Sequence, residues 1–176
     1  MRRILLVDDE INVIHALKRT IRQCGFDEDF TIETFTDPRL ALARSNEVAF
    51  DVVISDFRMP DMNGVEFLRA YKDIQADTVR MILSASTEFD TLMNAINQAE
   101  VFRYIAKPWL PEEVRETLLL ALERRDQSRE DLRLFNELRE HLGELTPQDL
   151  EAKRLEEEEP GITKVNWGPD GSVHLD

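Results

Sequence analysis

The stretch FDVVISDFRMPDMNG, residues 50–64, decides the fold and poses the main question about function. The apolar run Val52–Ile54 is typical of a short strand that is buried on both faces of a parallel sheet. Asp56 follows almost at once, and Met59-Pro60 and Asn63-Gly64 then turn the chain. The pattern therefore places a carboxylate directly after the C-terminal end of a buried strand.

Short apolar runs alternate with helical patterns from Arg3 to about Arg125. Each run is followed by apolar residues at helical spacing, and Asp37-Pro38 is an N-cap with proline at the first helical position. Five such units predict an α/β fold with a doubly wound, five-stranded parallel sheet. The expected strands are 4–7, 30–35, 52–55, 79–83 and 101–106.

The fifth predicted helix begins at Pro111 and continues past the end of a compact domain. We expect a domain over residues 1–125 and an extension over 126–176, with a short helix from Thr146 and a terminal β-hairpin. Residues 125–129 interrupt the apolar stripe of the fifth helix, so a short pairing segment is favoured over a long coiled coil. Packing within the chain is the alternative to a homodimer. The candidate seam residues are Leu132, Phe135, Leu138 and Leu142.

Charge and cysteine content limit the classes of partner. The 176 residues include 22 basic and 36 acidic ones, a net charge of −14 that repels nucleic acids and anionic membranes. Cys24 is the single cysteine, so an internal disulfide is excluded, and His15, His141 and His174 are too scattered for a metal site. The first apolar run is too short for a signal peptide or a membrane span, so we expect a cytoplasmic protein.

Polar side chains follow four of the predicted strands at the points where these strands end. They are Asp8 and Asp9, then Asp56, Ser84 and Lys107. In such sheets, ligands bind outside the carboxyl ends of the strands. Crowded carboxylates need a counter-charge, and hard oxygen ligands suit Mg²⁺. With a lysine and a hydroxyl as phosphate donors, one carboxylate becomes a candidate nucleophile that forms an aspartyl phosphate.

Four stretches carry a resemblance to a known family. ILLVDDE (4–10), DVVISDFRMPDMNGVEFL (51–68), VRMILSAS (79–86) and FRYIAKPW (102–109) resemble the receiver domains of bacterial two-component response regulators, including chemotaxis regulators. The resemblance covers residues 2–125 and implies a flavodoxin-like strand order of 2-1-3-4-5. It also implies that phosphoryl transfer is the chemistry of the strand-end residues.

The resemblance implies a role for each of these residues. Asp56 matches the aspartate that is phosphorylated by a sensor histidine kinase or a phosphotransfer protein. Asp9 matches the direct Mg²⁺ ligand, with Asp8 beside it, and the backbone carbonyl of Arg58 matches another ligand of the same ion, as Asp56 does. Lys107 matches the lysine that pairs with the phosphoryl group, in a Lys-Pro peptide bond that is usually cis.

Two further pairs of residues match positions of regulation. Ser84 matches the switch hydroxyl, with serine in place of the commoner threonine, and Tyr104 matches the aromatic switch residue. Arg58 and Ser86 occupy positions that tune the lifetime of the phosphoryl group in this family.

The favoured function is a phosphorylation-controlled switch whose output is a protein–protein interaction or a regulated dimerisation. Such a regulator is no enzyme beyond its own phosphorylation and dephosphorylation. A Mg²⁺-dependent phosphohydrolase of the haloacid-dehalogenase kind is an alternative, but neither Asp8-Asp9-Glu10 nor Asp56-Phe57-Arg58 matches its Asp-x-Asp motif. A further alternative is a receiver fragment of a longer regulator, because FRYIAKPW is similar to receivers that precede phosphodiesterase or hydrogenase-regulator outputs.

Overall fold

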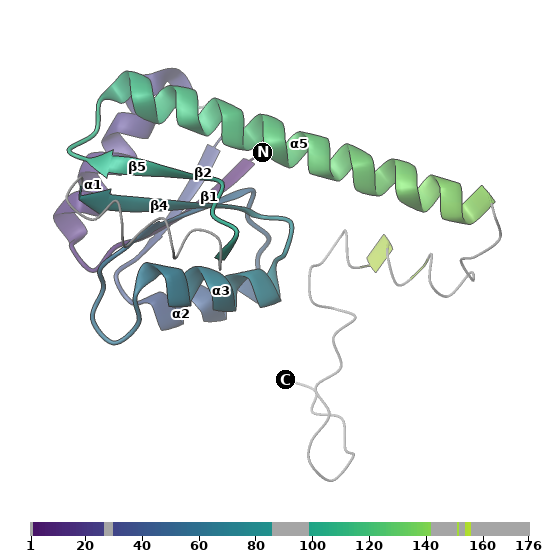
Figure 1. Ribbon diagram of the computed structural model, residues 1–176, viewed down its shortest axis with the longest axis horizontal. Coiled ribbons are helices and arrows are strands. Elements are labelled where there is room, and N and C mark those ends of the chain that lie inside the picture. Colours follow the sequence, from purple (N-terminus) through teal and green to yellow (C-terminus); the bar gives the residue numbers. More distant parts are fainter. Residues whose placement is uncertain (1, 27–29, 86–98, 142–150, 152–153, 156–176) are drawn as a thin grey trace, which may run out of the picture.

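A computed structural model describes residues 2–26, 30–85, 99–141, 151 and 154–155 of the chain (Figure 1). Its centre is a five-stranded parallel sheet in the order β2-β1-β3-β4-β5, which confirms the predicted fold class and strand order. The strands are β1 (Arg2–Val7), β2 (Phe30–Phe35), β3 (Val52–Asp56), β4 (Val79–Ala85) and β5 (Arg103–Lys107). The helices are α1 (Ile11–Ile21), the π-helical turn η1 (Arg22–Phe26), α2 (Pro38–Ser45), α3 (Gly64–Ile74) and α5 (Pro111–His141).

Helices cover both faces of the sheet, because successive strand side chains point to opposite faces (Figure 1). In β1, Ile4 and Leu6 pack with the apolar residues of α1 and α5. Leu5 and Val7 of the same strand pack with those of α2 and α3. The central strands β3 and β4 and most of β1 are therefore buried on both faces, whereas β2 and β5 at the sides of the sheet are partly exposed.

Local capping sets the start of two helices. The Asp37 side chain accepts a hydrogen bond from the Arg39 amide at 2.8 Å, so α2 begins at Pro38 as predicted. At the start of α3, the Asn63 side chain accepts from the Glu66 amide and the Glu66 carboxylate accepts from the Asn63 amide, both at 3.0 Å. This reciprocal cap directs α3 away from the end of β3.

Three strands end later than the apolar pattern predicts, and two begin elsewhere: β1 begins at Arg2 rather than residue 4, and β5 at Arg103 rather than residue 101. β3 includes Asp56, β4 reaches Ala85 and β5 reaches Lys107. The backbone ladder explains the difference, because Asp56 is in register with Leu83 and Lys107 with Ala85 whatever the polarity of their side chains. The predicted fourth helix, between the strands expected at 79–83 and 101–106, lies almost entirely outside the described residues. The terminal hairpin lies outside them too, as does nearly all of the helix expected after Thr146.

Helix α5 is 31 residues long and extends well past the sheet (Figure 1). Val114, Leu118 and Ala121 are fully buried against the sheet, whereas Leu132 and Phe135 are 49% and 56% exposed. Leu138, another residue of the candidate seam, is exposed as well, and Leu142 lies outside the described residues. Among the described helices, none combines the length and the apolar character that crossing a membrane requires.

Candidate functional site

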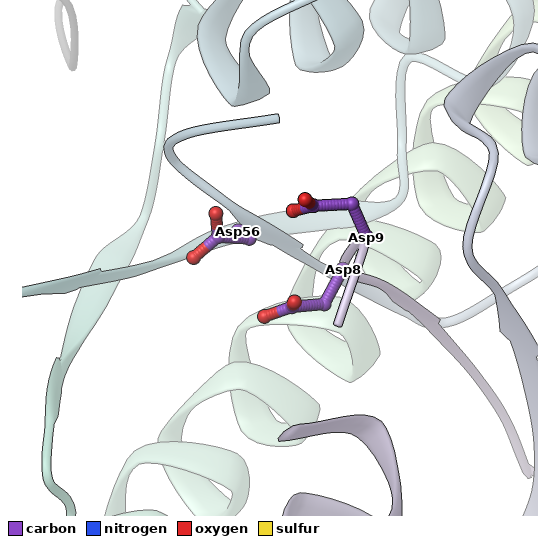
Figure 2. Close-up of side chains that lie close together, drawn as sticks. All are labelled: Asp8, Asp9 and Asp56. Atoms are coloured by element: carbon purple, nitrogen blue, oxygen red, sulfur yellow. The ribbon is translucent and has the colours of Figure 1, made fainter. Parts of the chain in front are cut away.

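Three carboxylates meet at the edge where β1 and β3 end (Figure 2). Asp8 and Asp9 directly follow β1, and Asp56 is the last residue of β3. One carboxylate oxygen from each lies within 4.8 Å of the others. Asp8 and Asp56 are only 2% and 6% exposed, whereas Asp9 is exposed. Ionised groups this close repel one another strongly unless a cation joins them.

Backbone amides hold the two buried carboxylates in place. Asp8 Oδ1 accepts a hydrogen bond from the Glu10 amide at 2.8 Å, where the chain enters α1. Asp56 Oδ2 accepts one from the Arg58 amide at 2.9 Å. Hydrogen bonds from backbone amides to a carboxylate are strong and directional, so each side chain is fixed before any ligand arrives.

A glycine lets α3 approach the end of β3. The Gly64 amide donates to the Phe57 carbonyl at 2.9 Å, and a Cβ on Gly64 would lie 2.0 Å from the backbone oxygen of Asp56. Only glycine fits this position without displacing the residue that carries the carboxylate. The sequence pattern predicts a turn at Asn63-Gly64 but not this contact. Glu66, three residues after Asn63, completes a capping box that marks the start of α3, but it does not indicate the contact with Asp56.

Lys107 supplies the positive charge at the same edge. As the last residue of β5, it donates from Nζ to Asp56 Oδ1 at 2.5 Å and to Asp8 Oδ2 at 2.9 Å. The next peptide bond, Lys107–Pro108, is cis, as the family resemblance implies. Trp109 then packs against the core and donates from its indole nitrogen to Thr20 Oγ1 at 3.0 Å. The connection that follows the lysine is thereby anchored to α1.

The local electrostatics follow from burial and from the lysine. Burial raises the pKa of Asp56 above its ordinary value; hydrogen bonding to Lys107 opposes this rise, and the charge of Asp8 adds to it. Burial by itself would lower the pKa of Lys107, but its hydrogen bonds to Asp56 and Asp8 outweigh that effect and raise it. The lysine is therefore a fixed positive charge between two buried carboxylates.

The remaining predicted site residues are Ser84, Tyr104, Arg58 and Ser86. Ser84 is buried near the end of β4, one position beyond the residue in register with Asp56, and its hydroxyl donates to the Ala85 carbonyl at 3.2 Å. Tyr104 lies on β5 and is 41% exposed. Arg58 follows Asp56 by two positions and is exposed. Ser86 lies outside the described residues.

The donor set fits a small, hard divalent cation. Asp8, Asp9 and Asp56 offer carboxylate oxygens within reach of a single ion, and oxygen is the ligand that Mg²⁺ prefers. One lysine leaves the three carboxylates with excess negative charge, and a divalent ion would remove that excess. The arrangement of these oxygens is therefore compatible with a bound divalent cation.

Known proteins share this fold and this sequence pattern. The family model for the response regulator receiver domain matches residues 4–119. The hydrogenase transcriptional regulatory protein HoxA of Cupriavidus necator is 33% identical over 136 residues, which is 77% of this chain and 27% of that protein. The chain spans about a quarter of the length of the curated relatives that it matches first.

Solved structures agree with the family match. The chemotaxis protein CheY4 of Vibrio cholerae is 31% identical with a TM-score of 0.62, covering 69% of this chain and 99% of that one. A signal receiver domain of an HD domain-containing protein from Pseudomonas fluorescens Pf-5 is 29% identical with a TM-score of 0.67, covering 73% and 92%. The chain therefore belongs to the receiver domain family of two-component response regulators.

Proposed function

We propose that this chain is a switch that is turned by phosphorylation of Asp56. The observation that carries the proposal is the buried Asp56 carboxylate, which lies close to Asp8 and Asp9 and accepts a hydrogen bond from the ammonium of Lys107. The phosphoryl donor is a sensor histidine kinase or a phosphotransfer protein, and the exchange takes place in the cytoplasm. Beyond its own phosphorylation and dephosphorylation, the chain catalyses no reaction.

In the proposed reaction, a carboxylate oxygen of Asp56 attacks the phosphorus of a phosphohistidine. An O–P bond forms, the N–P bond breaks, and the imidazole leaves with the bonding electron pair. The Arg58 amide holds the second oxygen of Asp56 and thereby orients the attacking one. The ammonium of Lys107 neutralises charge on the phosphoryl oxygens, which is the main demand of phosphoryl transfer.

We propose Mg²⁺ as the cofactor of this reaction. Asp8, Asp9 and Asp56 would hold it, together with the backbone carbonyl of Arg58. When bound, the ion supplies further positive charge for the phosphoryl oxygens. Asp8 contributes in a second way, because its other contact is the Lys107 ammonium at 2.9 Å, so it keeps the lysine close to the acceptor.

We further propose how the switch is read and reset. The phosphoryl group on Asp56 adds charge and acceptor oxygens, which draw the Ser84 hydroxyl toward the site and change the packing of Tyr104. Both residues lie on strands that contact α5. The change would therefore reach the face formed by β5 and α5, which we propose as the surface that partner proteins contact. Arg58 and Ser86 control how easily water reaches the phosphoryl group on Asp56 and hydrolyses it, and they thereby set its lifetime.

For the output, we propose that residues 1–125 form the receiver and that residues 126–176 form an interaction segment. The exposed side chains of Leu132, Phe135 and Leu138 support a homodimer seam, which would continue to Leu142. In a longer natural chain, an output domain would follow.

Sedimentation velocity with and without beryllofluoride tests the seam. Phe135→Asp should abolish the dimer, whereas Leu40→Asp, an equally exposed site on α2, should not.

Acetyl phosphate and Mg²⁺ test the phosphorylation itself. The wild type should gain one phosphoryl group by intact-protein mass spectrometry, and Asp56→Asn should gain none. Asp61→Asn is the matched control, because Asp61 is an exposed carboxylate in the loop between β3 and α3. Asparagine also tolerates the positive φ of 65° at this position. Labelling of Asp56→Asn at the wild-type level would overturn the proposal, and sustained hydrolysis of a phosphomonoester would favour a phosphohydrolase.

A further inference from the structure

A partly buried ionic cluster lies at the other end of the strands, where α5 leaves the domain. It consists of Asp51, Arg125 and Arg129 and is called the exit clamp below. Asp51 directly precedes β3 and is 4% exposed. Its Oδ1 atom lies 2.8 Å from Nη2 of Arg129 and 3.7 Å from Nε of Arg125. Two arginines on successive turns of α5 therefore share one carboxylate of the sheet.

The carboxylate is itself held rigidly. Asp51 Oδ2 accepts a hydrogen bond from the Arg3 amide at 2.8 Å, and the Asp51 amide donates to the Arg3 carbonyl at 2.9 Å. The Asp51 carbonyl accepts from the Val79 amide at 3.0 Å. Asp51 is thus tied to β1 and to β4, and its side chain offers α5 a fixed point on the sheet.

Two more contacts bind the same part of α5. The Arg2 guanidinium pairs with both oxygens of Asp126, at 2.6 and 2.7 Å. Arg125 Nη1 donates to the Asp77 carbonyl at 3.0 Å, in the loop before β4. Within the five residues 125–129, α5 is therefore attached to the starts of β1 and β3 and to the loop before β4.

The clamp is placed where apolar packing ends. Leu122 is the last side chain of α5 that belongs to the buried core, and Leu132 is already half exposed. In the part of the chain that the structure describes, the ionic contacts are what holds the helix between these residues. Without Asp51, the guanidinium groups of Arg125 and Arg129 would face one another with no carboxylate between them.

We infer that Asp51 is a positioning residue that fixes the direction in which α5 leaves the receiver. The exit clamp makes residues 126–141 a rigid arm of the sheet rather than a helix that frays once its packing ends. Asp51 acts through Arg125 and Arg129 and has no contact with Asp56, so the inference holds whether or not Asp56 is phosphorylated. A partner that binds residues 126–141 is then held in a fixed orientation relative to the receiver.

Hydrogen exchange of the full chain, followed by mass spectrometry, tests the inference. Asp51→Asn keeps the size of the side chain and an oxygen for the Arg3 amide, but removes the charge that the arginines share. Arg129 is half exposed, so the loss of its ion pair should have a modest effect, and exchange of the amides in residues 126–133 should rise by roughly two- to fivefold. Peptides from α1 should exchange at the wild-type rate.

Two further variants make the result decisive. Arg129→Gln removes the same ion pair from the exposed side and should raise exchange in the same residues, even if Asp51→Asn weakens the whole domain. Arg133→Gln is the matched control, because Arg133 pairs with Glu130 and Glu137 on α5 itself. Wild-type exchange of residues 126–133 in Arg129→Gln would overturn the inference, as would an equal rise in Arg133→Gln.

Discussion

Replacing Gly64 with alanine tests how the fold presents Asp56. The new Cβ would lie 2.0 Å from the Asp56 backbone oxygen, whereas ordinary contacts of a Cβ begin at 3.4 Å. The obstacle is backbone, so the start of α3 and the end of β3 have to separate by about 1.4 Å. Forcing extra atoms into a packed site costs about 1–3 kcal/mol, and we expect the upper end, about 3 kcal/mol.

Gly25→Ala is the control for this substitution. Gly25 has a φ of 85° with nothing within 4 Å of an added Cβ, so alanine there adds backbone strain but no collision. Such strain costs about 1–2 kcal/mol. For a chain of this size, 1 kcal/mol lowers Tm by about 2–4 °C, so Gly64→Ala should lose about 6–12 °C and Gly25→Ala about 2–8 °C.

The two variants should also differ in the chemistry of the site. Thermal unfolding by circular dichroism gives the Tm values, and labelling by acetyl phosphate gives the activity. We expect Gly64→Ala to label slowly, because Asp56 moves with its backbone, and Gly25→Ala to label at the wild-type rate. If Gly64→Ala were as stable as Gly25→Ala and labelled normally, the argument from close approach would be wrong.

Three shorter predictions concern other residues. Burial raises the pKa of Tyr71 to about 12, so its neutral form stabilises the fold fully below about pH 10, and this contribution is lost as the pH rises through 12. In Tyr104→Phe, where Tyr71 is the only tyrosine, absorbance at ~295 nm should therefore show no tyrosinate at pH 10, its ordinary pKa. Thr78→Val leaves the Phe50 carbonyl without its 2.8 Å donor and should cost about 1–3 kcal/mol in urea unfolding. Asp9→Asn should weaken Mg²⁺ binding by about tenfold in calorimetric titration, without loss of stability in EDTA, because Asp9 is exposed.

Much of the fold and of the centre of the site was predictable from local patterns. Apolar runs of four to six residues predict buried strands, and parallel strands end at a common edge. That rule is enough to bring Asp8, Asp56 and Lys107 together without knowledge of any distance. The strand ends themselves were less predictable, because polar residues such as Asp56 complete the backbone ladder as well as apolar ones do.

The contacts that depend on register could not be predicted. Residues 125–129 break the apolar stripe of α5, and the sequence pattern presents them as an interruption. In the structure, Arg125 and Arg129 instead reach Asp51, more than 70 positions earlier in the chain. Whether these side chains meet depends on how far α5 slides along the sheet, and no local propensity determines that distance. The approach of Gly64 to Asp56 has the same origin.

The site of phosphorylation is the most direct test of the central claim. After treatment with acetyl phosphate and Mg²⁺, borohydride reduces an aspartyl phosphate to an alcohol, and peptide mass spectrometry locates the changed residue. We expect the change at Asp56 alone, and its loss when Mg²⁺ is chelated before treatment. A reduced residue at Asp8 or Asp9, or labelling that does not depend on the metal, would contradict the account.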